Sequence, residues 1–138
     1  MNFLGAFVGI NIGTVVTDLP SAADVVAILK ANRITHIHLY DVDRHMLNAL
    51  AGTGIEVMVG VTNEEVLGIG ESPSPWINKN VASYLPETNI MTIAVGSEIL
   101  TSVPNAAPIL VRATTFTMLF WLLTSIFRSK FQVPSQWT

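Results

Sequence analysis

Four short apolar runs alternate with segments of helical character over the first hundred residues, and this alternation restricts the possible folds most. The runs are FVGINIG (7–13), ITHIHLY (34–40), IEVMVGV (55–61) and IMTIAVG (90–96). Continuous apolar runs of this length are typical of strands in a parallel sheet that is covered on both faces. Parallel strands joined through helices require right-handed crossovers, so the pattern predicts an α/β fold.

The segments between the runs carry helix signals. Ser21 with Asp24 three residues later has the spacing of a capping box, and Asn32 is expected to end that helix. Asp43 can cap a short second helix, and residues 76–85 are expected to form another that ends before Pro86. A further helix is expected over 103–112. The predicted apolar face of the first helix consists of Ala22, Val25, Val26, Ile28 and Leu29.

Charge divides the 138 residues into two unlike parts. Residues 1–98 hold all ten acidic residues and four of the seven basic ones, whereas residues 99–138 hold three basic residues and no acidic one. Six of the eleven aromatic residues lie in the last 23 positions. The modest overall acidity, a net charge of -3, does not favour nucleic acid as a partner.

Several kinds of chemistry find no support in the sequence. No cysteine is present, which excludes disulfides, thiolate nucleophiles and Cys-based metal sites. Neither a glycine-rich phosphate loop nor a G-x-S-x-G elbow occurs. His36 and His38 lie two apart on one strand and could bind a metal, but no third ligand has a supporting spacing, so a histidine pair without metal is favoured. We expect no cofactor.

Polar residues follow each of the four apolar runs. The carboxyl ends of parallel strands meet at one edge of the sheet, where α/β proteins place their active groups. A carboxylate beside hydroxyl and amide groups suits sugar recognition and acid/base work, although polar residues also occur at strand ends as helix caps and loop starts. The candidates are Asn11, Tyr40, Asp41, Asn63, Ser97 and Glu98.

Five stretches in a fixed order carry a resemblance to a known family. They are FVGINIG, LPSAADVVAILKANRITHIHLYD, GIEVMVGVTNEEV, WINKNVASYLP and IAVGSE. From residue 7 to 112 the sequence resembles plant glycoside hydrolase family 17, the endo-1,3-β-glucanases. The resemblance implies the first four units of a (β/α)₈ barrel, β-1,3-glucan as the partner, and hydrolysis with retention by two glutamates.

The resemblance also implies roles for individual residues. Glu98 would be the general acid/base, and Tyr40, Asp41, Asn63 and Ser97 would line the substrate groove. Ser97 stands where many members have asparagine. His38 stands where arginine is usual. No counterpart of the nucleophile glutamate occurs, and a barrel of this kind takes about 250 residues, so we expect no activity from the chain as written.

Residues 113–138 depart from the family and form an apolar, basic tail. Back-translation of FTMLFWLLTSIFRSKFQV with permitted codons, read in a neighbouring frame, gives FHNALLASNLDFQIKVSS, which contains the family's I-K-V-S strand. We therefore expect a frame error between residues 112 and 116, which the nucleotide sequence can test. A short membrane-associated tail is the alternative, although the run 116–127 is shorter than the roughly 20 residues of a membrane span.

Location and function class follow as expectations. The start, MNFLGAFVGINIG, has no basic region or apolar run of a secretory signal, so no signal peptide is predicted. By resemblance, members of the family are secreted to the cell wall or anchored to a membrane. Besides a glucanase, a non-catalytic half-barrel that binds β-glucan or a partner protein stays open, as does a complete small domain of flavodoxin-like strand order.

Overall fold

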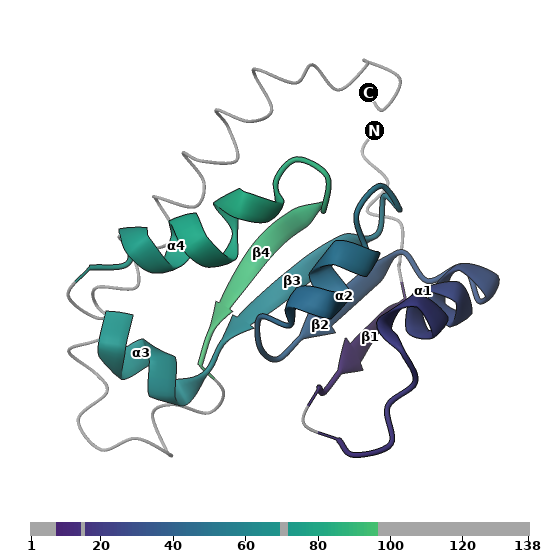
Figure 1. Ribbon diagram of the computed structural model, residues 1–138, viewed down its shortest axis with the longest axis horizontal. Coiled ribbons are helices and arrows are strands. Elements are labelled where there is room, and N and C mark those ends of the chain that lie inside the picture. The colour runs from purple at the N-terminus through teal and green to yellow at the C-terminus, as the bar shows by residue number, and fades with distance from the viewer. Residues whose placement is uncertain (1–7, 15, 70–71, 97–138) are drawn as a thin grey trace, which may run out of the picture.

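The fold is a parallel sheet whose strands follow one another in chain order (Figure 1). A computed structural model describes residues 8–14, 16–69 and 72–96. The strands are β1 (Gly9–Ile12), β2 (His36–Leu39), β3 (Glu56–Val61) and β4 (Ile90–Val95), and all three neighbouring pairs are parallel. The predicted α/β alternation is therefore confirmed. The helix expected over 103–112 and the whole tail lie outside the described residues.

The strand order separates two of the predicted folds. Each strand lies beside the one that precedes it, in the order β1-β2-β3-β4. A flavodoxin-like sheet would instead place a later strand on the far side of β1. Successive addition on one side is the arrangement of a (β/α) barrel, so the flavodoxin-like alternative is wrong.

Two of the four described helices, α1 and α2, begin directly after the predicted capping residues Ser21 and Asp43. They are α1 (Ala22–Ala31), α2 (Arg44–Ala49), α3 (Asn63–Ile69) and α4 (Ser74–Asn80), and a 3₁₀ turn (Ala82–Tyr84) comes after α4. The Asp24 backbone N–H donates to Ser21 Oγ, 3.2 Å away, and the Met46 N–H donates to Asp43 Oδ1, 2.8 Å away. Asn32 is the C-cap of α1, as predicted.

The helix predicted over residues 76–85 is shorter and begins earlier. It starts at Ser74, and Pro75 is tolerated there because the first turn of a helix needs no N–H donor. The helix ends at Asn80, and the chain tightens into the 3₁₀ turn before Leu85 becomes extended. Pro86 explains that extended residue, since a proline disfavours helical geometry at the position before it.

One face of the sheet and the inner faces of the helices form the core. Alternate residues of β2 and β3 point into it, and Leu39, Val57, Val59 and Val61 are almost completely buried. Helix residues Val26, Leu29, Leu47 and Ile77 pack in the same cluster. The opposite face carries His36, His38, Glu56 and Met58, which are only half-buried.

Two burial predictions are wrong. Ile28 is 54% exposed, so the apolar face of α1 is narrower than its sequence suggests. Three of the four β1 residues are also exposed, including Ile10. In the described sheet β1 is an edge strand that pairs only with β2, which explains its exposure. Within the described residues, no helix has the length and apolar character needed to cross a membrane.

Candidate functional site

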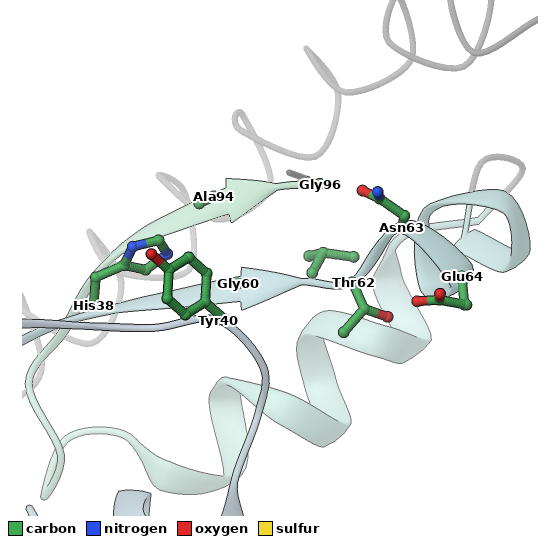
Figure 2. Close-up of a pocket in the computed structure, with 9 residues that line it drawn as sticks. His38, Tyr40, Gly60, Thr62, Asn63, Glu64, Ala94 and Gly96 are labelled. Atoms are coloured by element: carbon green, nitrogen blue, oxygen red, sulfur yellow. The ribbon is translucent and has the colours of Figure 1, made fainter. Parts of the chain in front are cut away.

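A pocket lies where the carboxyl ends of β2, β3 and β4 meet (Figure 2). Its volume is about 220 Å³, which is small for a whole ligand and suited to part of one. The lining combines one aromatic side chain, an imidazole, a hydroxyl, an amide and a carboxylate with small residues. These residues are His38, Tyr40, Gly60, Val61, Thr62, Asn63, Glu64, Ala94 and Gly96.

His38 and Tyr40 form one end of the pocket. His38 belongs to β2 and Tyr40 is the first residue after this strand, and Figure 2 shows their two side chains next to each other. Their ring centroids are 4.7 Å apart and the ring planes are tilted by 50°. Tyr40 is 48% exposed, whereas His38 is half-buried, and burial lowers the pKa of His38 below its ordinary value of 6.5. Burial therefore favours the uncharged form of this imidazole.

Gly60 of β3 allows the backbone of Tyr40 to approach. A Cβ atom at position 60 would lie 2.6 Å from the carbonyl carbon of Tyr40 and still closer to its oxygen. No side chain fits at that separation. A glycine inside a strand commonly marks such a close approach, and here it fixes where the aromatic end of the pocket stands relative to β3.

A capping box at the start of α3 holds the other end of the pocket. The Glu65 N–H donates to Thr62 Oγ1, 3.3 Å away, and the Thr62 N–H donates to Glu65 Oε2, 3.0 Å away. The indole Nε1 of Trp76 also donates to Glu65 Oε1, 3.1 Å away. This network orients Asn63 and Glu64 at the rim. The sequence itself carries the signal for this capping box, because Thr62 and Glu65 have the T-x-x-E spacing.

The structure brings together only some of the predicted site residues. Tyr40 and Asn63 line the pocket. Ser97 and Glu98 lie outside the described residues, immediately after the pocket residue Gly96. Asn11 instead borders a second cavity, of about 380 Å³, on the half-buried face of the sheet.

Asp41 is not among the residues that line this pocket, and its expected groove-lining role stays a prediction. Its Oδ2 accepts a 2.5 Å hydrogen bond from Thr14 Oγ1, which ties the segment after β1 to the end of β2. Its Oδ1 is buried and has no hydrogen-bond partner in the described part of the chain. In this arrangement Asp41 is a structural link between two strand ends.

His36 and His38 lie on the same side of β2 but have different partners. His36 Nε2 is 2.6 Å from Glu56 Oε2 on the neighbouring strand, and Thr35 Oγ1 lies 2.7 Å from His36 Nδ1. His38 instead contacts Tyr40. Within residues 8–96, apart from the undescribed positions, no three His, Asp or Glu side chains are grouped so that they could hold a metal ion.

Comparison with known proteins identifies the family. The family model for glycosyl hydrolases family 17 matches residues 8–118. The chain belongs to this family. The resemblance found in the sequence is thereby confirmed, and the described residues form part of its (β/α) barrel. The expected division of the chain at residues 112 and 113 stays a prediction.

Individual relatives of this family 17 chain agree with the assignment. Glucan endo-1,3-beta-glucosidase 4 of Arabidopsis thaliana is 60% identical over 111 residues, which are 78% of this chain and 22% of that protein. Glucan endo-1,3-beta-glucosidase 3 of the same plant is 51% identical over 114 residues, 80% of this chain and 23% of the relative. The chain therefore spans about a fifth of the length of these curated relatives.

Solved structures show the same fold. One of two plant beta-glucan endohydrolases with distinct substrate specificities superposes with a TM-score of 0.70 at 32% identity, over 77% of this chain and 34% of that one. CJP38, a beta-1,3-glucanase and allergen of Cryptomeria japonica pollen, gives a TM-score of 0.69 at 32% identity. The superposition covers 80% of this chain and 37% of CJP38.

Proposed function

We propose that this chain supplies the general acid/base and one wall of the substrate groove for hydrolysis of O-glycosyl bonds in β-1,3-glucans. The observation that carries the proposal is the pocket at the carboxyl ends of β2–β4 in a family 17 chain. Relatives up to 60% identical over this region are named glucan endo-1,3-beta-glucosidases. Tyr40 and Asn63 offer the groove an aromatic face and an amide.

Glu98 is the proposed general acid/base. It follows Gly96, which lines the pocket, by two residues in the sequence, and this short separation supports the proposal. A carboxylic acid in this role protonates the glycosidic oxygen as the bond to the leaving sugar breaks, and later deprotonates the attacking water. Partial burial or a second nearby carboxylate keeps such an acid protonated at working pH.

A retaining glycosidase also needs a second carboxylate as its nucleophile, and we find no counterpart of it in these 138 residues. In a retaining glycosidase it lies about 5–5.5 Å from the acid/base and attacks the anomeric carbon. No Asp or Glu follows Glu98 in the 138 residues. We therefore expect the 138-residue chain by itself to bind β-1,3-glucan without hydrolysing it, which is also the behaviour of a non-catalytic glucan-binding half-barrel.

Two measurements on the 138-residue chain test the proposal. Isothermal titration with laminarihexaose should show saturable binding, and cellohexaose serves as the control ligand with a different linkage. Reducing-sugar release from laminarin should stay at the level of a Glu98→Gln variant. No saturable binding of laminarihexaose would overturn the glucan assignment. Turnover that Glu98→Gln leaves unchanged would overturn the role of Glu98, and turnover lost in that variant would show that the nucleophile is among these residues after all.

A further inference from the structure

Two of the residues that line the pocket, His38 and Tyr40, are in ring contact with each other. The ring centroids of His38 and Tyr40 are 4.7 Å apart with a 50° tilt, within the range of favourable ring contacts (Figure 2). Tyr40 is 48% exposed at the rim, so one face of a large aromatic ring is available to a ligand. A sugar ring presents a C–H face that packs against such a surface.

We propose that His38 is a positioning residue that holds the Tyr40 ring at the angle in which it stacks on a glucosyl unit of the bound glucan. The inference rests on the proposed function, because it names how that site recognises its substrate. His38 acts through Tyr40 and does not itself contact the sugar.

The surroundings of Tyr40 leave this task to His38. Among the described residues that line the pocket, His38 is the only other one with a ring, and the neighbouring Gly60, Ala94 and Gly96 are too small to support the tyrosine side chain. Gly60 fixes the backbone of Tyr40 but cannot set the orientation of its ring. Burial also lowers the pKa of His38, which favours the uncharged form of the imidazole next to Tyr40.

A direct hydrogen bond from the imidazole to the sugar is the competing explanation, and substitutions separate the two. His38→Phe keeps a ring beside Tyr40 but removes both ring nitrogens. His38→Leu fills a similar volume without an aromatic face. Tyr40→Ala removes the stacking surface, and the double variant His38→Leu/Tyr40→Ala tests whether the two residues act together.

The experiment is a titration of each variant of the 138-residue chain with laminarihexaose. We expect Tyr40→Ala and His38→Leu each to weaken binding by about three- to tenfold, and the double variant to be no weaker than Tyr40→Ala alone. His38→Phe should bind within about twofold of the original chain, as a ring contact predicts.

The outcomes that overturn the inference differ from those that overturn the proposed function. Absence of binding by the original chain would contradict the glucan assignment itself. If the original chain binds, losses that multiply in the double variant, or unchanged binding by His38→Leu, would overturn the positioning role. Should His38→Leu fail to fold, His38→Phe decides alone: retained affinity supports positioning, and lost affinity assigns the imidazole nitrogens to the sugar.

Discussion

Gly60 and Tyr40 lie so close that a Cβ atom on Gly60 would be 2.6 Å from the Tyr40 carbonyl carbon. Because the clashing group is backbone, it cannot rotate away as a side chain could. The absence of a side chain at Gly60 of β3 therefore allows the end of β2 to lie this close. It thereby also sets the position of the aromatic end of the pocket.

Gly60→Ala should lower both stability and glucan affinity. The added methyl forces a backbone shift, and overpacking of this kind costs about 1–3 kcal/mol in the free energy of unfolding. Gly68→Ala is the matched control, because a Cβ there meets nothing within 4 Å and the residue lies in α3. That control should stabilise the chain by about 0.5–1 kcal/mol. Urea unfolding measures both, and equal effects of the two substitutions would refute the close-approach explanation.

Thr88→Val should destabilise the fold far from the pocket. Thr88 is buried, and its Oγ1 donates a 2.7 Å hydrogen bond to the carbonyl oxygen of Leu47, 41 residues earlier in the chain. Valine keeps the shape but leaves that carbonyl without this donor, at a cost of about 1–3 kcal/mol. Thr92→Val on an exposed position of β4 should change the free energy of unfolding by less than about 0.5 kcal/mol. A Thr88→Val variant as stable as the Thr92 control would contradict the role of the hydrogen bond.

Arg33→Gly should stabilise the chain. Arg33 has φ of 55°, and the hydrogen bonds from Arg33 N to Lys30 O and from Ile34 N to Leu29 O form a Schellman motif at the end of α1. A non-glycine residue in this conformation costs roughly 1–2 kcal/mol, part of which glycine returns in unfolded-state entropy, so a net gain of about 0.5–1 kcal/mol is expected. Arg33→Ala, which removes the charge but keeps a Cβ, should give no gain. A thermal-unfolding midpoint raised equally by both substitutions would indicate that charge is responsible.

The free energy of unfolding should decrease as the pH is lowered, and His38 should cause part of this decrease. Burial lowers the pKa of His38 in the folded chain below its ordinary value of 6.5. Between those two values the unfolded chain binds more protons, so the free energy of unfolding decreases as pH falls below 6.5. His38→Phe removes this contribution and should show a smaller loss between pH 7.5 and 5.5 in urea unfolding. An identical loss in the variant would mean that other groups cause the whole dependence.

The strands could be predicted from sequence because their signals are local. The residues at which the strands begin could not be predicted, because they depend on contacts that no short sequence pattern reveals. Residues 34–40 alternate like a strand, yet β2 begins at His36, because the N–H of Ile34 is used by Leu29 O to close α1. β1 has the composition of a buried strand but stands at the edge of the described sheet.

In the candidate site, too, contacts between residues close in sequence could be predicted, whereas contacts between distant residues could not. The ring contact between His38 and Tyr40 joins two residues that are only two positions apart in the sequence, at the end of β2 and directly after it. The hydrogen bond between Asp41 and Thr14 could not be predicted from local spacing, because Thr14 lies 27 residues earlier in the chain. The Thr62–Glu65 capping box has a local sequence signal in its T-x-x-E spacing. The hydrogen bond from Trp76 to Glu65 has no such signal, because it depends on how α4 packs.

The central claim is that β-1,3-glucan binds at the carboxyl ends of β2–β4, and an NMR titration of the ¹⁵N-labelled chain with laminarihexaose tests it most directly. The account predicts saturable shifts of the backbone amides of Tyr40, Thr62, Asn63 and Gly96, with little change at Thr88 and along α1. Shifts confined to residues away from this pocket, or no saturable shift at all, would contradict it.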